Sequence, residues 1–332
     1  MGPCILKCFY SAAVTIIFAT SGFAAPVNFK LLSLVPADAQ IVAGFQDLHR
    51  AVPSGRVLLT THNNRLDLDD WIALTGVDTS KVFDEVIEVA MSSDAAELRE
   101  HLLLVAGHFD RARIFQAAEQ NGAAHVSYLG ETALLIKPYS REEGDMMDTR
   151  WLVILNDQTG IFGTAAMVQL ALQRYDSHYL PDPALVQRLA RLRPDVTSWN
   201  VLLPPSKSKR EMGFVQPHGA WSQLLDGADL VIVGTHFGSR IRMDLLVDDG
   251  KGRGTAYFAE KAGYFVEVFS GEAANHGDSS PREQPRLRDL LIEEDRMQGS
   301  IVLSEKQFYA WRNREVSHNQ AFLQAAHGTP GD

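Results

Sequence analysis

The fold is indicated most clearly by one stretch of the chain, "HLLLVAGHFDRARIFQAAEQNGAAHVSYLGETALLIKPY", residues 101–139. Its opening residues are mostly apolar, as in a buried strand. In the next segment Asp110 stands where a helix N-cap is expected, and Gly122 follows the last helical residue. "AHVSYLG" and "TALLIKPY" have strand-like composition and pair as a hairpin across Gly130-Glu131. A strand, a helix and an antiparallel hairpin in succession predict an α+β fold.

The flanking sequence continues this mixture of strands and helices. Further strands are predicted at residues 41–45, 84–93, 150–157, 160–163, 197–204, 228–238, 239–249 and 299–303. Helices are predicted at residues 65–76, 164–175, 182–192, 218–225 and 304–315. The strands adjoin one another through short turns, which favours antiparallel pairing.

One pattern occurs twice. "DQTGIFGTAAMVQLAL" starts at Asp157 and "DDGKGRGTAYFAEKAG" at Asp248, and in each an acid is followed by five residues and then by Gly-Thr-Ala at a helix start. The echo suggests two related halves, each an antiparallel sheet with helices on one face. The predicted organisation is a signal peptide at 1–24, α+β domains at 25–194 and 195–316, a mobile loop at 271–284 and a frayed tail at 317–332.

The N-terminus is typical of an export signal. Lys7 precedes an apolar run at residues 8–20, and Gly22 and Ala24 occupy the −3 and −1 positions of a cleavage site. The run is shorter than the roughly 20 residues that span a bilayer. We expect cleavage after Ala24 and a periplasmic or secreted protein, with an uncleaved anchor as the alternative.

Composition narrows the function classes. Both cysteines, Cys4 and Cys8, lie in the predicted leader, so the mature chain would have no disulfide and no thiolate metal ligand. The net charge of −10 disfavours nucleic acid as a partner. The one dense basic run, "KSKR" at residues 207–210, follows two prolines and is interpreted as a loop.

A glycine-rich loop is the sharpest chemical candidate. "LLVDDGKGRGTAYFAEKAGYF" (residues 245–265) has the strand, glycine loop and helix order of a phosphate-binding site. A Walker loop, however, needs glycine where Leu245 stands and Ser or Thr where Gly252 stands, and the dinucleotide fingerprint needs glycine at Thr255. We interpret the loop as a strand-to-helix connection with Thr255 as the N-cap. A phosphate or nucleotide binder through the loop 248–255 remains an alternative.

The histidines show no metal-binding spacing. His108 and Asp110 lie together at a strand-to-helix turn, but Asp110 is better explained as a helix cap and His108 as a surface residue. His218 and His236 could meet only in the folded chain. We therefore predict no metal and no cofactor.

Two other candidates are weak. The acidic stretch "SREEGDMMDT" (residues 140–149) has the charge of a cation loop without the spacing of an EF-hand. Ser239 lies at an expected hairpin turn and not at a nucleophile elbow. A triad assembled from distant residues stays open, because triads are defined by geometry, and the catalytic residues are unknown.

The segment "LVPADAQIVAGFQDLHR" (residues 34–50) is similar to the start of uncharacterised exported bacterial proteins, whose mature chain opens with Leu-x-Pro-Ala-Asp-x-x-x-Val-x-Gly. The later stretches "GVDTSKVFDEVIEVAMSS", "LLLVAGHFDRARI", "LVILNDQTGIFGTAAMVQLAL" and "ADLVIVGTHFGSRIRMDLL" fit the same layout. The resemblance implies an exported α+β protein with repeated strand-helix-strand units and no assigned activity.

These observations favour an exported non-catalytic protein that binds a partner or ligand in the cell envelope. The first alternative is an exported hydrolase with dispersed catalytic residues. The second is the phosphate or nucleotide binder through the loop 248–255. A deep pocket with convergent groups would favour the enzyme, and an exposed apolar patch would favour partner binding.

Overall fold

The computed structural model describes residues 27–46, 75–77, 79–91, 101–136, 149–203, 223–224, 226–270 and 287–311. The predicted signal peptide, the loop at 271–284 and the tail at 317–332 lie outside these residues, as do nearly all of the helices predicted at 65–76 and 218–225.

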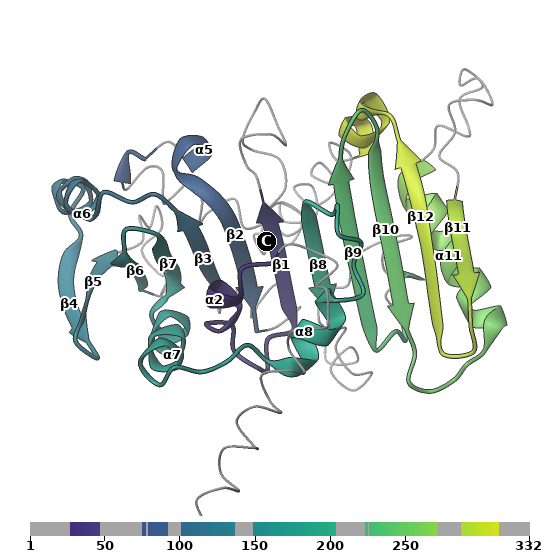
Figure 1. Cartoon of the computed structure of the whole chain (residues 1–332), viewed down its shortest axis with the longest axis horizontal. Coiled ribbons are helices and arrows are strands. Elements are labelled where there is room, and N and C mark those ends of the chain that lie inside the picture. The colour runs from purple at the N-terminus through teal and green to yellow at the C-terminus, as the bar shows by residue number, and fades with distance from the viewer. Residues whose placement is uncertain are drawn as a thin grey trace, which may run out of the picture.

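Twelve strands in the described part of the chain form one continuous antiparallel sheet (Figure 1). In chain order they are β1 (Ile41–Gln46), β2 (Phe83–Ala90), β3 (His101–Gly107), β4 (Ala124–Tyr128), β5 (Glu131–Ile136), β6 (Arg150–Asn156), β7 (Thr159–Thr164), β8 (Ser198–Leu202), β9 (Leu230–Phe237), β10 (Ile241–Asp248), β11 (Leu287–Ile292) and β12 (Arg296–Leu303). Across the sheet they run β11-β12-β10-β9-β8-β1-β2-β3-β7-β6-β5-β4. The predicted α+β fold is confirmed, with one large sheet in place of separate ones.

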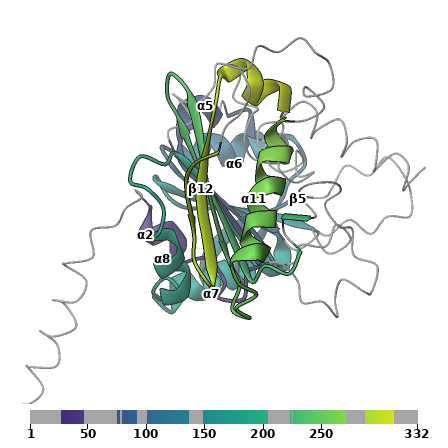
Figure 2. The same ribbon diagram turned by 90° about the vertical axis from the view of Figure 1, so that its right-hand side faces the viewer.

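Helices lie on both faces of this sheet. The labelled helices are α2 (Phe29–Leu32), α5 (Thr79–Val82), α6 (Arg111–Gln120), α7 (Ala165–Asp176), α8 (Pro183–Leu189) and α11 (Thr255–Ser270), and residues 305–311 are helical as well. One core cluster joins α2, α7 and α8 to the sheet, and a second joins α11 to the opposite face (Figure 2). We call these the α7 face and the α11 face.

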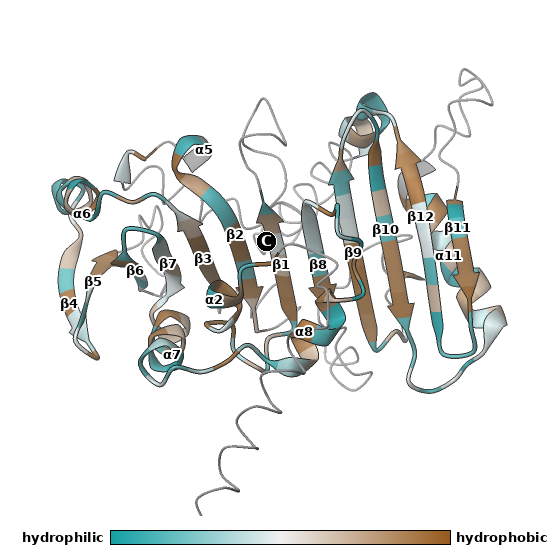
Figure 3. Cartoon of the chain, viewed as in Figure 1, coloured by the Kyte–Doolittle hydropathy of each residue, from teal (hydrophilic) through white to brown (hydrophobic). Residues whose placement is uncertain are grey.

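The sequence of the strands explains why helices must pack on both faces of the sheet. In β9, Leu230 and Ile232 belong to the α7-face cluster, whereas Val231 and Val233 belong to the α11-face cluster. Successive side chains of a strand point to opposite faces. An unbroken apolar run therefore needs cover on both sides (Figure 3). The expectation of helices on one face is replaced by this two-sided arrangement.

The strand order repeats in the two halves of the sheet. β1-β2-β3-β7-β6 and β8-β9-β10-β12-β11 follow the same path, and α6 follows β3 as α11 follows β10. The α6 and α11 clusters lie on the same face, and Phe237 packs against both. The β4–β5 hairpin is an addition to the first half.

The repeated sequence pattern does not mark equivalent places in these halves. "DQTGIFGT" forms the β6–β7 turn and β7 itself, in which Ile161 and Phe162 are fully buried. "DDGKGRGT" forms the loop between β10 and α11, in which Gly252 and Gly254 have φ values of 59° and 82°. Left-handed glycines cannot continue a strand. The topological counterpart of the β6–β7 turn is the turn between β11 and β12.

The halves meet where β1 pairs with β8. Gly44 of β1 lies opposite Trp199 of β8, and a Cβ built on Gly44 would overlap the indole ring. In the same "LVPADAQIVAG" stretch, Leu34 and Val42 are buried in the α7-face core. The stretch therefore supplies strand pairing and core packing at the centre of the molecule.

Candidate partner-binding surface

The backbone N–H groups of the glycine loop already have hydrogen-bond acceptors within the chain, including two carboxylates. Asp249 is 0 % exposed and accepts hydrogen bonds from the backbone N–H groups of Lys251 (3.1 Å) and Arg253 (3.1 Å). Asp229 accepts one from the Gly250 N–H at 2.8 Å, and the Gly252 N–H donates to the Asp249 carbonyl. A bound phosphate would need backbone N–H groups as donors. The four successive N–H groups of residues 250–253 already donate to acceptors of the chain.

Arg253 also has a structural role. Its guanidinium donates to the Asp249 carboxylate and the Gly227 carbonyl, and lies 4.2 Å from the centre of the Tyr257 ring. Burial raises the pKa of Asp249, but the hydrogen bonds from Arg253 and from the two amides outweigh it and hold that pKa below its usual range. The loop is a self-neutralised joint between β10 and α11.

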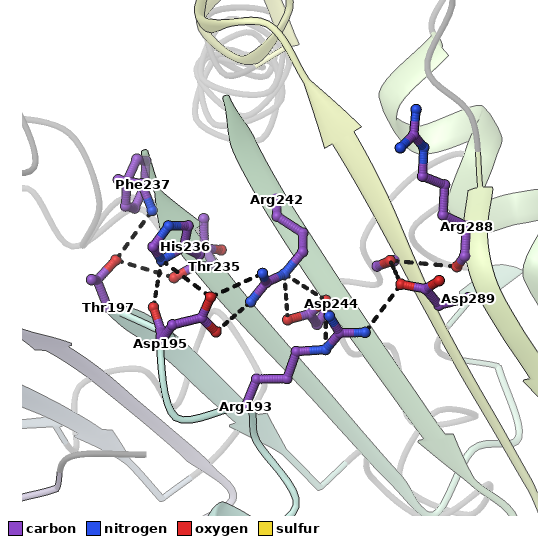
Figure 4. Close-up of polar contacts among 11 residues, drawn as sticks. Arg193, Asp195, Thr197, Thr235, His236, Phe237, Arg242, Asp244, Arg288 and Asp289 are labelled. Atoms are coloured by element: carbon purple, nitrogen blue, oxygen red, sulfur yellow. Dashed lines mark hydrogen bonds and ion pairs between the residues drawn. The ribbon is translucent and has the colours of Figure 1, made fainter. Parts of the chain in front are cut away.

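A charged network lies on the α7 face of the second half (Figure 4). It ties the segment that leads from α8 into β8 onto β10, and alternate residues of that segment meet residues of opposite charge on the strand. The three pairs are Arg191–Asp248, Arg193–Asp244 and Asp195–Arg242.

Arg242 is the centre of the network. Its two terminal nitrogens donate to the Asp195 carboxylate at 3.0 Å and 2.6 Å, and its Nε donates to Asp244 at 3.1 Å. The hydrogen bonds from Arg242 hold the pKa of Asp195 below its usual range. Burial raises the pKa of Asp244 in spite of the two neighbouring arginines.

The network extends to the edge strand. Arg193 Nη2 donates to Asp289 at 3.1 Å, and the Ser300 hydroxyl donates to the same carboxylate at 3.2 Å. Each of the four carboxylates thus has an arginine partner within the chain. The network fixes the linker between the halves, and its three arginines are all paired with carboxylates of the same chain.

Among the described residues, His236 is the imidazole that lies beside this network. Its Nδ1 lies 2.5 Å from the Asp195 carbonyl oxygen and 3.8 Å from the Asp195 carboxylate. Its Nε2 faces Gly238, since a Cβ there would lie 3.0 Å from that nitrogen. The nearby Thr197 hydroxyl donates to the Thr235 carbonyl. No hydroxyl in the described ranges hydrogen-bonds to His236, so this acid–imidazole pair lacks a nucleophile.

The other predicted residues do not converge. Asp110 caps α6 by accepting a hydrogen bond from the Arg113 N–H at 3.1 Å. His108 lies 3.9 Å from Asp84, and the side chains of His108 and Asp84 are both exposed. Ser239 lies in the β9–β10 turn. His218, the acidic stretch at 140–148 and the basic run at 207–210 lie outside the described residues.

The described surface has one marked apolar projection. Three of the eight exposed large apolar side chains, Tyr175, Tyr179 and Leu180, lie within six residues at the end of α7. Leu180 is 76 % exposed and Tyr179 57 %, the two highest values of the eight. We call residues 174–182 the α7 tip. Sequence reasoning missed it, because an apolar residue in a connection carries no periodic signal.

The α7 tip is held by a helix C-cap. The Tyr179 N–H donates to the Arg174 carbonyl and the His178 N–H to the Tyr175 carbonyl, which is the Schellman pattern. His178 takes the left-handed position with φ of 51°, where glycine is usual. Arg174 donates to the Leu180 and Ser33 carbonyls and lies 4.8 Å from the Tyr179 ring centre. The apolar projection is therefore ordered.

Comparison with known proteins gives little further information. The chain matches no protein-family profile and no curated protein. A solved structure described as crystal form I of TP0453 aligns with this chain at a TM-score of 0.45 and 10 % sequence identity. The alignment covers 88 % of this chain and 99 % of the other. A likeness at that level carries no argument about function. No helix within the described ranges is long and apolar enough to cross a bilayer, and no three metal-ligating residues gather there.

Proposed function

We propose that this chain is an exported, non-catalytic protein that binds a partner in the cell envelope. The observation that carries the proposal is a contrast between two kinds of surface. The charged groups of the loop and of the network have partners within the chain, whereas ordered apolar side chains project into solvent at the α7 tip. Surfaces of the second kind are typical of interaction sites.

The two alternatives have less support. A hydrolase needs a nucleophile beside its base, and His236 has none in the described ranges. A phosphate binder needs free amides at the glycine loop, and those of residues 250–253 are occupied.

The experiment places a photo-reactive residue at position 180, 129 or 291 of the full chain, expressed in an exporting bacterial host. The three positions carry exposed leucines in three separate places: after α7, in the turn between β4 and β5, and in β11. We expect a discrete protein adduct from at least one of them. If none of the three positions gives a protein adduct and the purified chain hydrolyses generic ester or peptide substrates, the protein is an enzyme.

Export has its own test. The intact mass of the exported chain should correspond to a protein that begins at Ala25. A protein that still begins at Met1 would contradict the predicted cleavage.

A further inference from the structure

We propose that the α7 tip is the docking element of this protein, and that its partner is a protein with an apolar pocket rimmed by basic side chains. This inference rests on the proposed partner-binding function and names the surface and the partner's chemistry. The tip presents Tyr175, Tyr179 and Leu180 together. Aromatic and aliphatic anchors that fill a pocket supply most of the affinity at protein interfaces.

The tip is built to keep its shape without a partner. Two backbone hydrogen bonds close the helix end, and Arg174 ties the Leu180 and Ser33 carbonyls together beneath the Tyr179 ring. His178 adopts a left-handed backbone that L-residues disfavour. Such outliers persist where the surrounding structure holds them, often at ligand-contacting sites. A preorganised loop loses little conformational entropy on binding.

The charge around the tip indicates the rim of the partner. Asp176 and Asp182 flank the apolar side chains in sequence, and Asp38 and Asp182 both act electrostatically on Arg174. The guanidinium is occupied by backbone carbonyls, so three carboxylates outnumber one cation. Complementary charge at an interface rim accelerates association and selects the partner. A basic rim is therefore the fitting counterpart.

A membrane surface fits less well. The chain carries a net charge of −10, which opposes approach to anionic lipid headgroups. The tip offers few apolar side chains, and stable membrane anchoring needs a larger apolar area or a second attraction. Lipid binding is therefore an outcome that the test must separate from protein binding.

The test uses the full chain with a photo-reactive residue at position 180, and the same residue at position 129 as the matched control. Leu129 is also an exposed leucine outside the helices and strands, in the turn between β4 and β5. We expect a discrete adduct with another protein from position 180 and none from position 129. Because rim charges contribute to association, Asp176→Asn with Asp182→Asn should lower the adduct yield about fivefold. Asn keeps the α8 cap that Asp182 provides.

Several results would overturn the inference. One is an adduct from position 180 whose yield does not change when the two Asn substitutions are made. Another is an adduct in which the chain is cross-linked to a second copy of itself. A third is Leu180-dependent sedimentation of the purified chain with vesicles of phosphatidylethanolamine and phosphatidylglycerol. Protein adducts from position 129 or 291 alone would support the proposed partner-binding function but would contradict the docking role of the α7 tip. The absence of a protein adduct at all three positions would contradict both the function and the docking role.

Discussion

At the scale of single residues, Gly44 and Trp199 determine how closely β1 and β8 approach. The indole ring occupies the space that a Cβ on Gly44 would need. Trp199 is almost fully buried in the α7-face core, so it has no room to move away. The glycine that ends the Leu-x-Pro-Ala-Asp-x-x-x-Val-x-Gly stretch is thus explained by packing.

Gly44→Ala should destabilise the protein by about 2–3 kcal/mol, because overpacking forces the ring or the strand to shift. Urea unfolding of the purified protein measures the effect. Gly263→Ala is the matched control, since Gly263 lies within α11 and a Cβ there meets nothing within 4 Å. That substitution should stabilise by about 0.5–1 kcal/mol. Equal effects of the two substitutions would contradict the proposed close contact.

Glu85 gives the protein a pH dependence. Its side chain is 8 % exposed, and burial raises its pKa to about 7 even though the Asn28 N–H donates to it at 3.2 Å. The folded state therefore binds this proton more tightly than the unfolded state. The free energy of unfolding should fall as the pH rises from about 4.5 to about 7, and the penalty stays in place above that range.

Glu85→Gln should remove this slope. We expect the variant to be more stable than the natural chain by about 1–2 kcal/mol at pH 8, with a smaller difference at pH 5, because Gln stays neutral and still accepts from Asn28. Urea unfolding at the two pH values provides the comparison. A variant that is less stable at pH 8 would show that the folded chain needs the carboxylate.

At the scale of elements, the charged network fixes the linker between the halves. Arg242→Met removes the partner of Asp195 and leaves the mostly buried Asp244 with only the longer Arg193 contact. We expect a loss of about 1–3 kcal/mol, since a buried carboxylate without a partner is costly. Arg296→Met on β12 is the control, because its pair with Glu293 is exposed. The control should cost less than about 0.5 kcal/mol, and equal losses would argue against a bracing role.

Local sequence signals predicted the elements that have local causes. β3, α6 and the β4–β5 hairpin follow from an apolar run, the Asp110 cap and Gly130, with the turn at Leu129–Gly130, one residue earlier than expected. β11 was missed, since its side chains are mostly exposed, and its pairing with β12 shifts register beyond Arg288, where Asp289 is left-handed. The C-cap of α7 was missed because His178 stands where glycine would signal it.

At the scale of the whole molecule, pairing between distant strands decides the architecture. The sequence suggested two halves, and the repeated strand order agrees with that interpretation. It could not show that the halves share one sheet, because the contact of β1 with β8 joins residues far apart in the chain and leaves no periodic pattern. The opposed charges of residues 191–195 and 242–248 were the one available signal of the network.

The junction of the two halves can be tested through its register. The Gln46 N–H donates to the Thr197 carbonyl and the Leu203 N–H to the Gln40 carbonyl, which makes Ala43 and Asn200 a non-hydrogen-bonded pair. The Cα atoms of such pairs lie about 4.5 Å apart, within the range that a disulfide bridges.

The most direct measurement is therefore the oxidation state of an Ala43→Cys, Asn200→Cys variant of residues 25–332, which contain no other cysteine. We predict a complete intramolecular disulfide in the folded chain, and reduced thiols in the diagonal control Ala43→Cys, Leu202→Cys. Thiols that stay reduced in the first variant, or a disulfide that forms only in the control, would contradict a single sheet with this register.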